Sequence, residues 1–97
     1  MSTESLINVR IPTPLRNLTA GRDVVAVTGS TIRDVIENLE KDFGGIRERL
    51  CEPDGRIRPY VRVFLNDEDV RFLQSGETPV QAGDTVTILP AIAGGLR

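Results

Sequence analysis

The stretch TIRDVIENLEKDF, residues 31–43, is the one long helical pattern in this 97-residue chain, and it decides the fold. Its apolar residues recur at helical spacing and form a single stripe: Ile32, Val35, Ile36, Leu39 and Phe43. A hydroxyl residue, Ser30 or Thr31, can cap the first turn, and Gly44 and Gly45 end the helix. A helix with one apolar stripe is expected to cover one face of a sheet.

Two strand patterns precede this helix. Residues 6–11 (LINVRI) alternate between apolar and polar side chains, which predicts a half-buried strand. Prolines end this strand, and residues 19–23 (TAGRD) are typical of a turn. Residues 23–27 (DVVAV) are rich in β-branched residues and lie close enough along the chain to pair with the first strand as a hairpin.

Further strand patterns follow the helix. The strongest is residues 60–65 (YVRVFL), whose alternating side chains divide between two faces. The other elements are predicted, in chain order, as a short helical turn at 46–50, a loop at 52–58, an acidic turn at 66–69, a short edge strand at 70–73, a turn at 81–84 and a last strand at 85–89.

This order of elements predicts an α+β fold. A starting hairpin, one main helix and returning strands suit a β-grasp, or ubiquitin-like, architecture: a mixed sheet of four to five strands packed on one helix. The first and last strands are expected side by side in the middle, joined by a right-handed crossover. We expect a single β-grasp domain over residues 1–90 and a flexible C-terminal tail over residues 91–97.

Composition narrows the function. A formal net charge of −2 argues against a nucleic-acid partner, and no apolar run is long enough for a membrane span. The start lacks a signal peptide, and the lone Cys51 cannot form an internal disulfide, so we expect a cytoplasmic protein. Histidine is absent, which removes the usual general base and the commonest metal ligand. Hydrolytic or metal chemistry within the chain itself is therefore not expected.

The tail, PAIAGGLR at residues 90–97, holds the candidate functional residues. Small residues at Ala93, Gly94 and Gly95 allow the backbone to enter a narrow cleft and approach a ligand closely. Five residues beyond Pro90, Gly95 can reach about 17 Å from the last strand. A Gly-Gly pair taken alone also fits an ordinary frayed terminus. Its position directly behind the last strand of a β-grasp pattern favours a functional tail.

Four stretches together resemble the MoaD/ThiS family of ubiquitin-like sulfur carriers, and within it the CysO-type branch: TIRDVIENLEKDF, IRERL, RPYVRVFLNDEDVRF and GDTVTILPAIAGG. The resemblance implies that Gly95 is adenylated with ATP by a separate E1-like adenylyltransferase/sulfurtransferase and then converted to a thiocarboxylate. The carrier binds no cofactor, because the partner enzyme uses the ATP, and it is not itself an enzyme. In the CysO branch a cysteine synthase accepts the sulfur, and a JAMM-type metallopeptidase releases cysteine from the carrier.

The chain departs from the family pattern by continuing past the diglycine with Leu96 and Arg97. We expect these two residues to mask Gly95 until cleavage between Gly95 and Leu96 removes them; a cloning remnant is the alternative explanation. Other acceptors also stay open: thiamin, molybdopterin or a secondary metabolite. A protein modifier conjugated through Gly95 and a passive binding module remain as alternatives of other classes.

A partner-binding surface is predicted on the sheet face opposite the helix. Tyr60 and Phe64 alternate with the residues expected in the core, and Thr87 and Leu89 should join them from the last strand. An exposed apolar patch of this kind is typical of a docking site, although a second small core under the loops would give the same pattern. Cys51 is expected to be an incidental loop residue.

Overall fold

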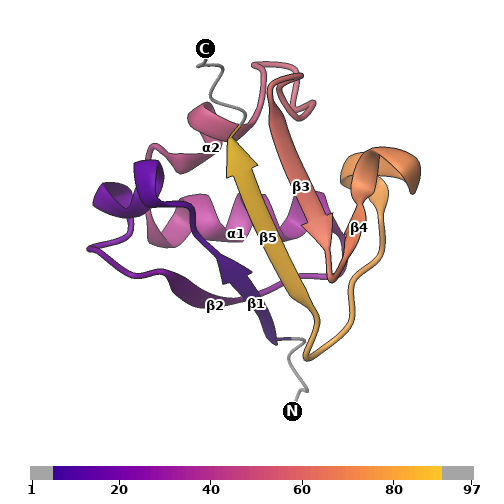
Figure 1. Ribbon diagram of the computed structural model, residues 1–97, viewed down its shortest axis with the longest axis horizontal. Coiled ribbons are helices and arrows are strands. Elements are labelled where there is room, and N and C mark those ends of the chain that lie inside the picture. Colours follow the sequence, from indigo (N-terminus) through magenta and orange to yellow (C-terminus); the bar gives the residue numbers. More distant parts are fainter. Residues whose placement is uncertain (1–5, 91–97) are drawn as a thin grey trace.

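The structure is a computed structural model that describes residues 6–90, and it has a five-stranded mixed sheet with a helix across one face (Figure 1). The strands are β1 (Leu6–Arg10), β2 (Val24–Thr28), β3 (Val61–Leu65), β4 (Glu68–Asp69) and β5 (Thr85–Pro90). The helices are α1 (Ile32–Asp42) and α2 (Ile46–Leu50), with 3-10 helices η1 (Thr13–Leu18), η2 (Val70–Phe72) and η3 (Ser75–Glu77).

The strand order is β2-β1-β5-β3-β4, so the last strand lies in the middle of the sheet. β5 runs parallel to β1 and antiparallel to β3, while β1 and β2 form an antiparallel hairpin. The predicted β-grasp fold and the predicted adjacency of the first and last strands are confirmed.

The helix α1 begins and packs as its sequence predicts. The Thr31 hydroxyl accepts a hydrogen bond from the Asp34 amide at 3.2 Å, and the Asp34 carboxylate accepts one from the Ser30 amide at 3.3 Å. This reciprocal pair satisfies the Asp34 amide, which the first turn leaves without a helical partner, and the Ser30 amide just before the cap. The stripe is buried at Ile32, Val35, Ile36 and Leu39. In Figure 1, α1 crosses behind the strands, so its stripe and the facing strand residues make the core.

The joint between α1 and α2 depends on Glu40. Its carboxylate accepts hydrogen bonds from the amides of Arg47, at 2.9 Å, and Gly45, at 3.1 Å. These bonds favour the ionised carboxylate, with Arg47 contributing most, and lower the pKa of Glu40. Gly45 has a φ of +98°, a left-handed conformation that glycine adopts without strain. Glu40 therefore fixes the direction in which α2 leaves α1.

The prediction of an edge strand at residues 70–73 is wrong. The edge strand is β4, at Glu68–Asp69, inside the segment that was expected to be an acidic turn. After β4 the chain turns into η2, because the Asp69 side chain accepts a hydrogen bond from the Arg71 amide at 2.9 Å and caps that helix. Val70, the first residue of η2, is fully buried. A local cap and one buried valine therefore bend the segment away from the sheet.

Candidate functional site

The C-terminal end of β5 is where the chain leaves the sheet toward the predicted tail. Pro90 pairs with Val61, and Leu89 pairs with Arg62 across the β3–β5 ladder. The predicted adenylation, recognition and processing residues lie outside the described residues: Ala93, Gly94, Gly95, Leu96 and Arg97. Their roles remain predictions. The structure places the strand that carries them in the middle of the sheet, held by β1 and β3.

Among residues 6–90, no helix covers the side of the central strands opposite α1, and we call this side the open face (Figure 1). Its members alternate with buried core residues along β1, β3 and β5: Asn8, Arg10, Arg62, Phe64, Thr87 and Leu89. Phe64 pairs with Thr87, so the two lie side by side, as the sequence predicts. The Leu89 side chain is 46% exposed, and Phe64 is half-buried. The open face is therefore an accessible, partly apolar surface next to the exit of the tail.

Tyr60 lies apart from the β3 ladder. It comes one residue before β3 begins and is 52% exposed. It lines a cavity of about 410 Å³ between η1 and α2, where Pro14 and Arg49 are among its neighbours. All three predicted surface residues thus lie in or beside β3 and β5. Phe64 and Leu89 lie on the open face, whereas Tyr60 lines the cavity between η1 and α2.

Two arginines lie on the open face that the sequence pattern had not indicated as site residues. Arg10 on β1 pairs in register with Thr87, and Arg62 on β3 pairs with Leu89. Both side chains are exposed, and neither forms an ion pair with another residue in the range 6–90. The signal was present in the alternation, since both residues lie between apolar residues that point into the core.

A shallow cavity of about 140 Å³ adjoins the open face at the ends of β1 and β5. Arg10, Arg16 and Asp23 supply its charged groups, and Leu89 contributes to its apolar wall. The Arg16 Nε donates a hydrogen bond to the Ile11 carbonyl at 3.0 Å, which holds the guanidinium at this position. Two cations and one anion leave this hollow with a basic balance.

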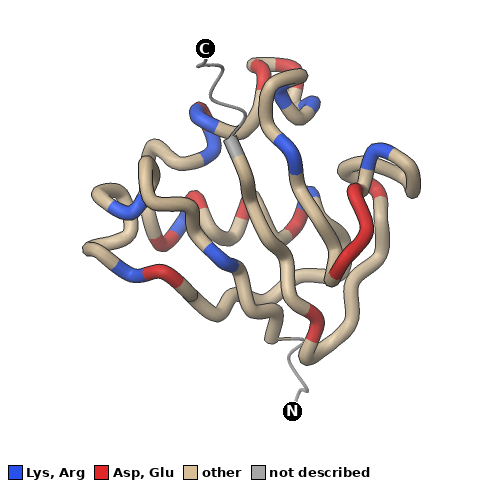
Figure 2. Tube along the Cα trace, viewed as in Figure 1, with Lys and Arg blue, Asp and Glu red and all other residues tan. Residues whose placement is uncertain are grey.

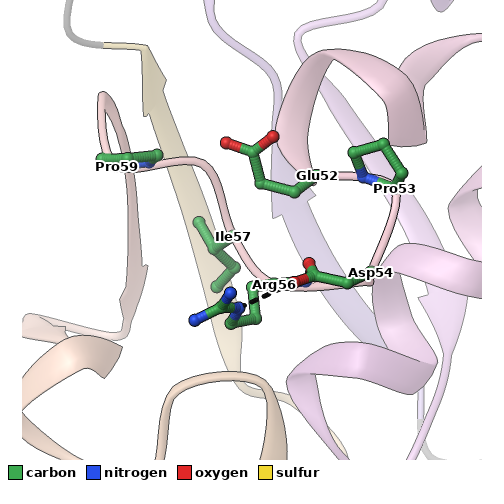
Figure 3. Close-up of a pocket in the computed structure, with 6 residues that line it drawn as sticks. All are labelled: Glu52, Pro53, Asp54, Arg56, Ile57 and Pro59. Carbon is green, nitrogen blue, oxygen red and sulfur yellow. Dashed lines mark hydrogen bonds and ion pairs between the residues drawn. The ribbon is translucent and has the colours of Figure 1, made fainter.

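Another cavity lies in the loop that joins α2 to β3. Figure 3 shows this cavity of about 510 Å³, lined by Glu52, Pro53, Asp54, Arg56, Ile57 and Pro59. Asp54 and Arg56 form an ion pair at 2.9 Å, and hydrogen bonds from Arg56 are the largest cause of the lowered pKa of Asp54. Because the Arg56 side chain is 82% exposed, this pair belongs to a solvated loop surface. No polar groups converge here on a point where a substrate could react.

The remaining chemistry of the described chain is sparse. Cys51 is buried, and desolvation raises the pKa of its thiol, which disfavours the reactive thiolate. Within residues 6–90, no three acidic or cysteine side chains gather closely enough to hold a metal ion. In the same part of the chain, no helix has the length and apolar character to cross a membrane.

Comparison with known proteins defines the class that this fold represents. The ThiS family model matches residues 9–95, and the chain belongs to the ThiS family. The match includes β3 and β5, the two strands that pair next to the start of the tail. It ends at Gly95, the second glycine of the diglycine pair. The family resemblance seen in the sequence is therefore confirmed.

The particular relatives are CysO proteins. The chain is 46% identical over 91 residues to the sulfur carrier protein CysO of Mycobacterium tuberculosis, covering 92% of this chain and 98% of the relative. The crystal structure of the Mycobacterium tuberculosis CysO matches with a TM-score of 0.84 and 44% identity, over 89% of this chain and 99% of that one.

A second solved structure contains a carrier of the same kind in a complex. A chain of the Amycolatopsis orientalis BexX/CysO complex matches with a TM-score of 0.87 and 43% identity, over 92% of this chain and 99% of that chain. Similarity at this level covers most of this chain and nearly all of that one.

Proposed function

We propose that this chain is a sulfur carrier protein whose working group is the carboxylate of Gly95, exposed after Leu96 and Arg97 are removed. The single observation that carries the proposal is the ThiS family match, which ends at Gly95. The similarity to CysO proteins over nearly the whole chain favours the same role.

The reaction follows from the chemistry of a carboxylate. The Gly95 carboxylate attacks the α-phosphate of ATP on an E1-like enzyme, which forms an acyl-adenylate and releases pyrophosphate. A sulfur donor then displaces AMP, and the carboxylate oxygen is replaced by sulfur. The resulting thiocarboxylate is nucleophilic and tethered, so it reaches its acceptor at high effective concentration. The carrier contributes recognition and reach, while its partners contribute the catalytic groups.

The most fitting acceptor is the cysteine pathway, because a relative and a solved structure that match over most of the chain carry the CysO name. In this proposal a cysteine synthase attaches the new cysteine to Gly95, and a JAMM-type metallopeptidase releases it. A protease of that type would also remove Leu96 and Arg97 from the precursor. No cofactor is bound by the carrier, since ATP belongs to the partner enzyme.

The test compares two forms of the chain, one ending at Gly95 and one retaining Leu96 and Arg97. Each is incubated with the E1-like enzyme, ATP and sulfide, and intact-protein mass spectrometry follows the exchange of oxygen for sulfur. We expect the exchange only in the form that ends at Gly95, and a form ending at Gly94 serves as the matched control. Equal conversion of both longer forms would refute masking, and branched conjugates on target lysines would identify a protein modifier instead.

A further inference from the structure

The two edges of the described sheet differ in length and in charge, because β2 forms one edge and β4 the other. β4 has two residues, Glu68 and Asp69, both acidic, and the chain turns away into η2 directly behind them. Short, charged edges of this kind resist pairing with strands of other molecules. β2 has five residues, VVAVT at 24–28, and carries no charge. Figure 2 shows the contrast, with a red β4 and a tan β2.

The outer side of β2 exposes backbone groups that need partners. The Ile11 amide donates a hydrogen bond to the Asp23 carbonyl at 2.8 Å, which fixes the phase of the β1–β2 ladder. Because bonded residues alternate along an antiparallel strand, every second residue of β2 directs its amide and carbonyl away from β1: Val24, Ala26 and Thr28. Within residues 6–90, the one partner of these groups is the Asn38 side chain, which donates to the Thr28 carbonyl at 2.8 Å. The remaining donors and acceptors match those of another strand.

The side chains along this edge also favour burial. Val24 is 46% exposed, and Ala26 is exposed as well. Leu6, which pairs with Thr28 on the neighbouring strand β1, is 52% exposed. Apolar side chains beside an unpaired strand edge are typical of a site that another chain covers.

Charge decides in which direction a second copy of β2 can run. The two residues before β2 are Arg22 and Asp23, and the two after it, Gly29 and Ser30, are uncharged. Two parallel copies in register would bring each charged residue beside its own counterpart, which is unfavourable. In an antiparallel pair, the charged end of each copy lies beside the uncharged end of the other. The edge is therefore complementary to itself in the antiparallel direction.

We propose that β2 pairs antiparallel with β2 of a second copy of this chain, so that two sheets join into one continuous sheet. A two-fold axis at Ala26 sets Val24 of each copy opposite Thr28 of the other. Leu6 lies on the next strand in the same row, so the exposed apolar side chains of both copies gather along the seam. The pairing buries little surface, and the dimer is therefore weak and reversible.

This inference goes beyond the proposed function, and neither depends on the other. In the sheet, β1 separates β2 from β5, so the seam lies two strands away from the strand that leads to the tail. The two-fold axis reverses the direction of every strand in the second copy. The two β5 strands therefore end at opposite ends of the joined sheet, and the seam covers neither of those ends.

The test measures self-association of the full chain by sedimentation equilibrium. We expect the average mass to rise from that of one chain toward twice that mass as the concentration approaches about 1 mM. Ala26→Lys places like charges opposite each other at the axis and should weaken association about fivefold. An equal mixture of the Ala26→Lys and Ala26→Glu variants should restore association, because opposite charges then meet. Thermal melting confirms that each variant is folded.

The matched control is Asn8→Lys, which makes the same change in net charge directly opposite Ala26 on the inner strand β1. This variant should associate like the wild type. Hydrogen exchange followed by NMR should slow with rising concentration at the outward amides of β2 and stay unchanged at those of β4. A wild-type chain that keeps the mass of one copy at every concentration would overturn the proposal and leave the edge to a strand of another protein. Unchanged association of Ala26→Lys would also overturn it, because another surface would then be responsible.

Discussion

The two faces of the central sheet are built from the same three strands and have opposite properties. On the side facing α1, Val63, Val86 and Ile88 are each 1% exposed. On the open face, one residue along the same strands, Leu89 is 46% exposed and Arg62 is free of ion pairs within the described range. Stability therefore constrains one face, and the other can change its side chains to suit a partner at little cost to the fold.

The strongest test of this difference between the two faces substitutes two neighbouring residues of β5. Ile88→Asp places a carboxylate in the core without a partner, which costs several kcal/mol and should leave the chain unfolded. Leu89→Asp makes the same chemical change on the open face and should keep a wild-type circular dichroism spectrum and a cooperative melt. Unfolding by Leu89→Asp would show that the open face is covered and structural.

A smaller loss of stability is expected at Gly29, where a core side chain approaches the backbone closely. A Cβ added at Gly29 would lie 2.8 Å from Val35 Cγ2 and 3.0 Å from the Val35 amide nitrogen. Gly29→Ala should thus push β2 and α1 apart and lower the free energy of unfolding by about 1–3 kcal/mol, measured by urea denaturation. Gly44→Ala is the control, because only the Glu40 side chain at 3.8 Å would meet its Cβ. Equal losses at both sites would contradict the close approach.

Loss of the N-terminal cap of α1 should lower the free energy of unfolding somewhat less than Gly29→Ala does. Thr31→Ala removes the side-chain acceptor for the Asp34 amide and should cost about 1 kcal/mol. Thr31→Ser keeps the hydroxyl and should recover most of that stability in the same urea titration. Thr87→Ala, on the open face, is expected to change stability by less than about 0.5 kcal/mol. A larger effect at Thr87 than at Thr31 would reverse the ranking of the two faces.

The smallest predicted effect concerns Asp69, a buried acid on the edge strand β4. Hydrogen bonding to the Arg71 amide is the largest cause of the lowered pKa of Asp69. A lowered folded pKa means that the ionised group stabilises the fold above about pH 4, the ordinary value, and that this contribution disappears as the pH falls through the folded pKa. Asp69→Asn should therefore be less stable than wild type at pH 7, and the difference in stability should narrow as the pH falls below about 4. A difference that is constant with pH would show that ionisation of Asp69 is not responsible.

Most of the fold could be predicted because its signals are periodic. The stripe from Ile32 to Leu39 and the alternation in β1, β3 and β5 gave the helix, the strands and the buried set. The adjacency of β1 and β5 followed from β-grasp topology. The prediction for the segment after Asp69 was wrong because its β-branched and aromatic residues suggest a strand. In the structure, a single hydrogen bond from the Arg71 amide to the Asp69 carboxylate starts η2 instead.

The candidate site could be predicted from the sequence only in part, for a different reason. Phe64 and Leu89 could be placed by alternation, but Tyr60 lies before the ladder begins, where period-two reasoning no longer applies. Arg10 and Arg62 became notable only once the strand register placed both on the open face, with no ion pair for either within residues 6–90. Pairing between distant side chains depends on tertiary structure, which a single sequence does not encode in any short pattern.

The order of the strands also governs how the domain is made. In the described sheet β1 and β3 do not pair with each other, and each is joined to β5. A growing polypeptide that has not yet extended through residue 90 has two separate half-sheets with open edges, which chaperones and proteases recognise. The ribosome must release this strand before the halves can join.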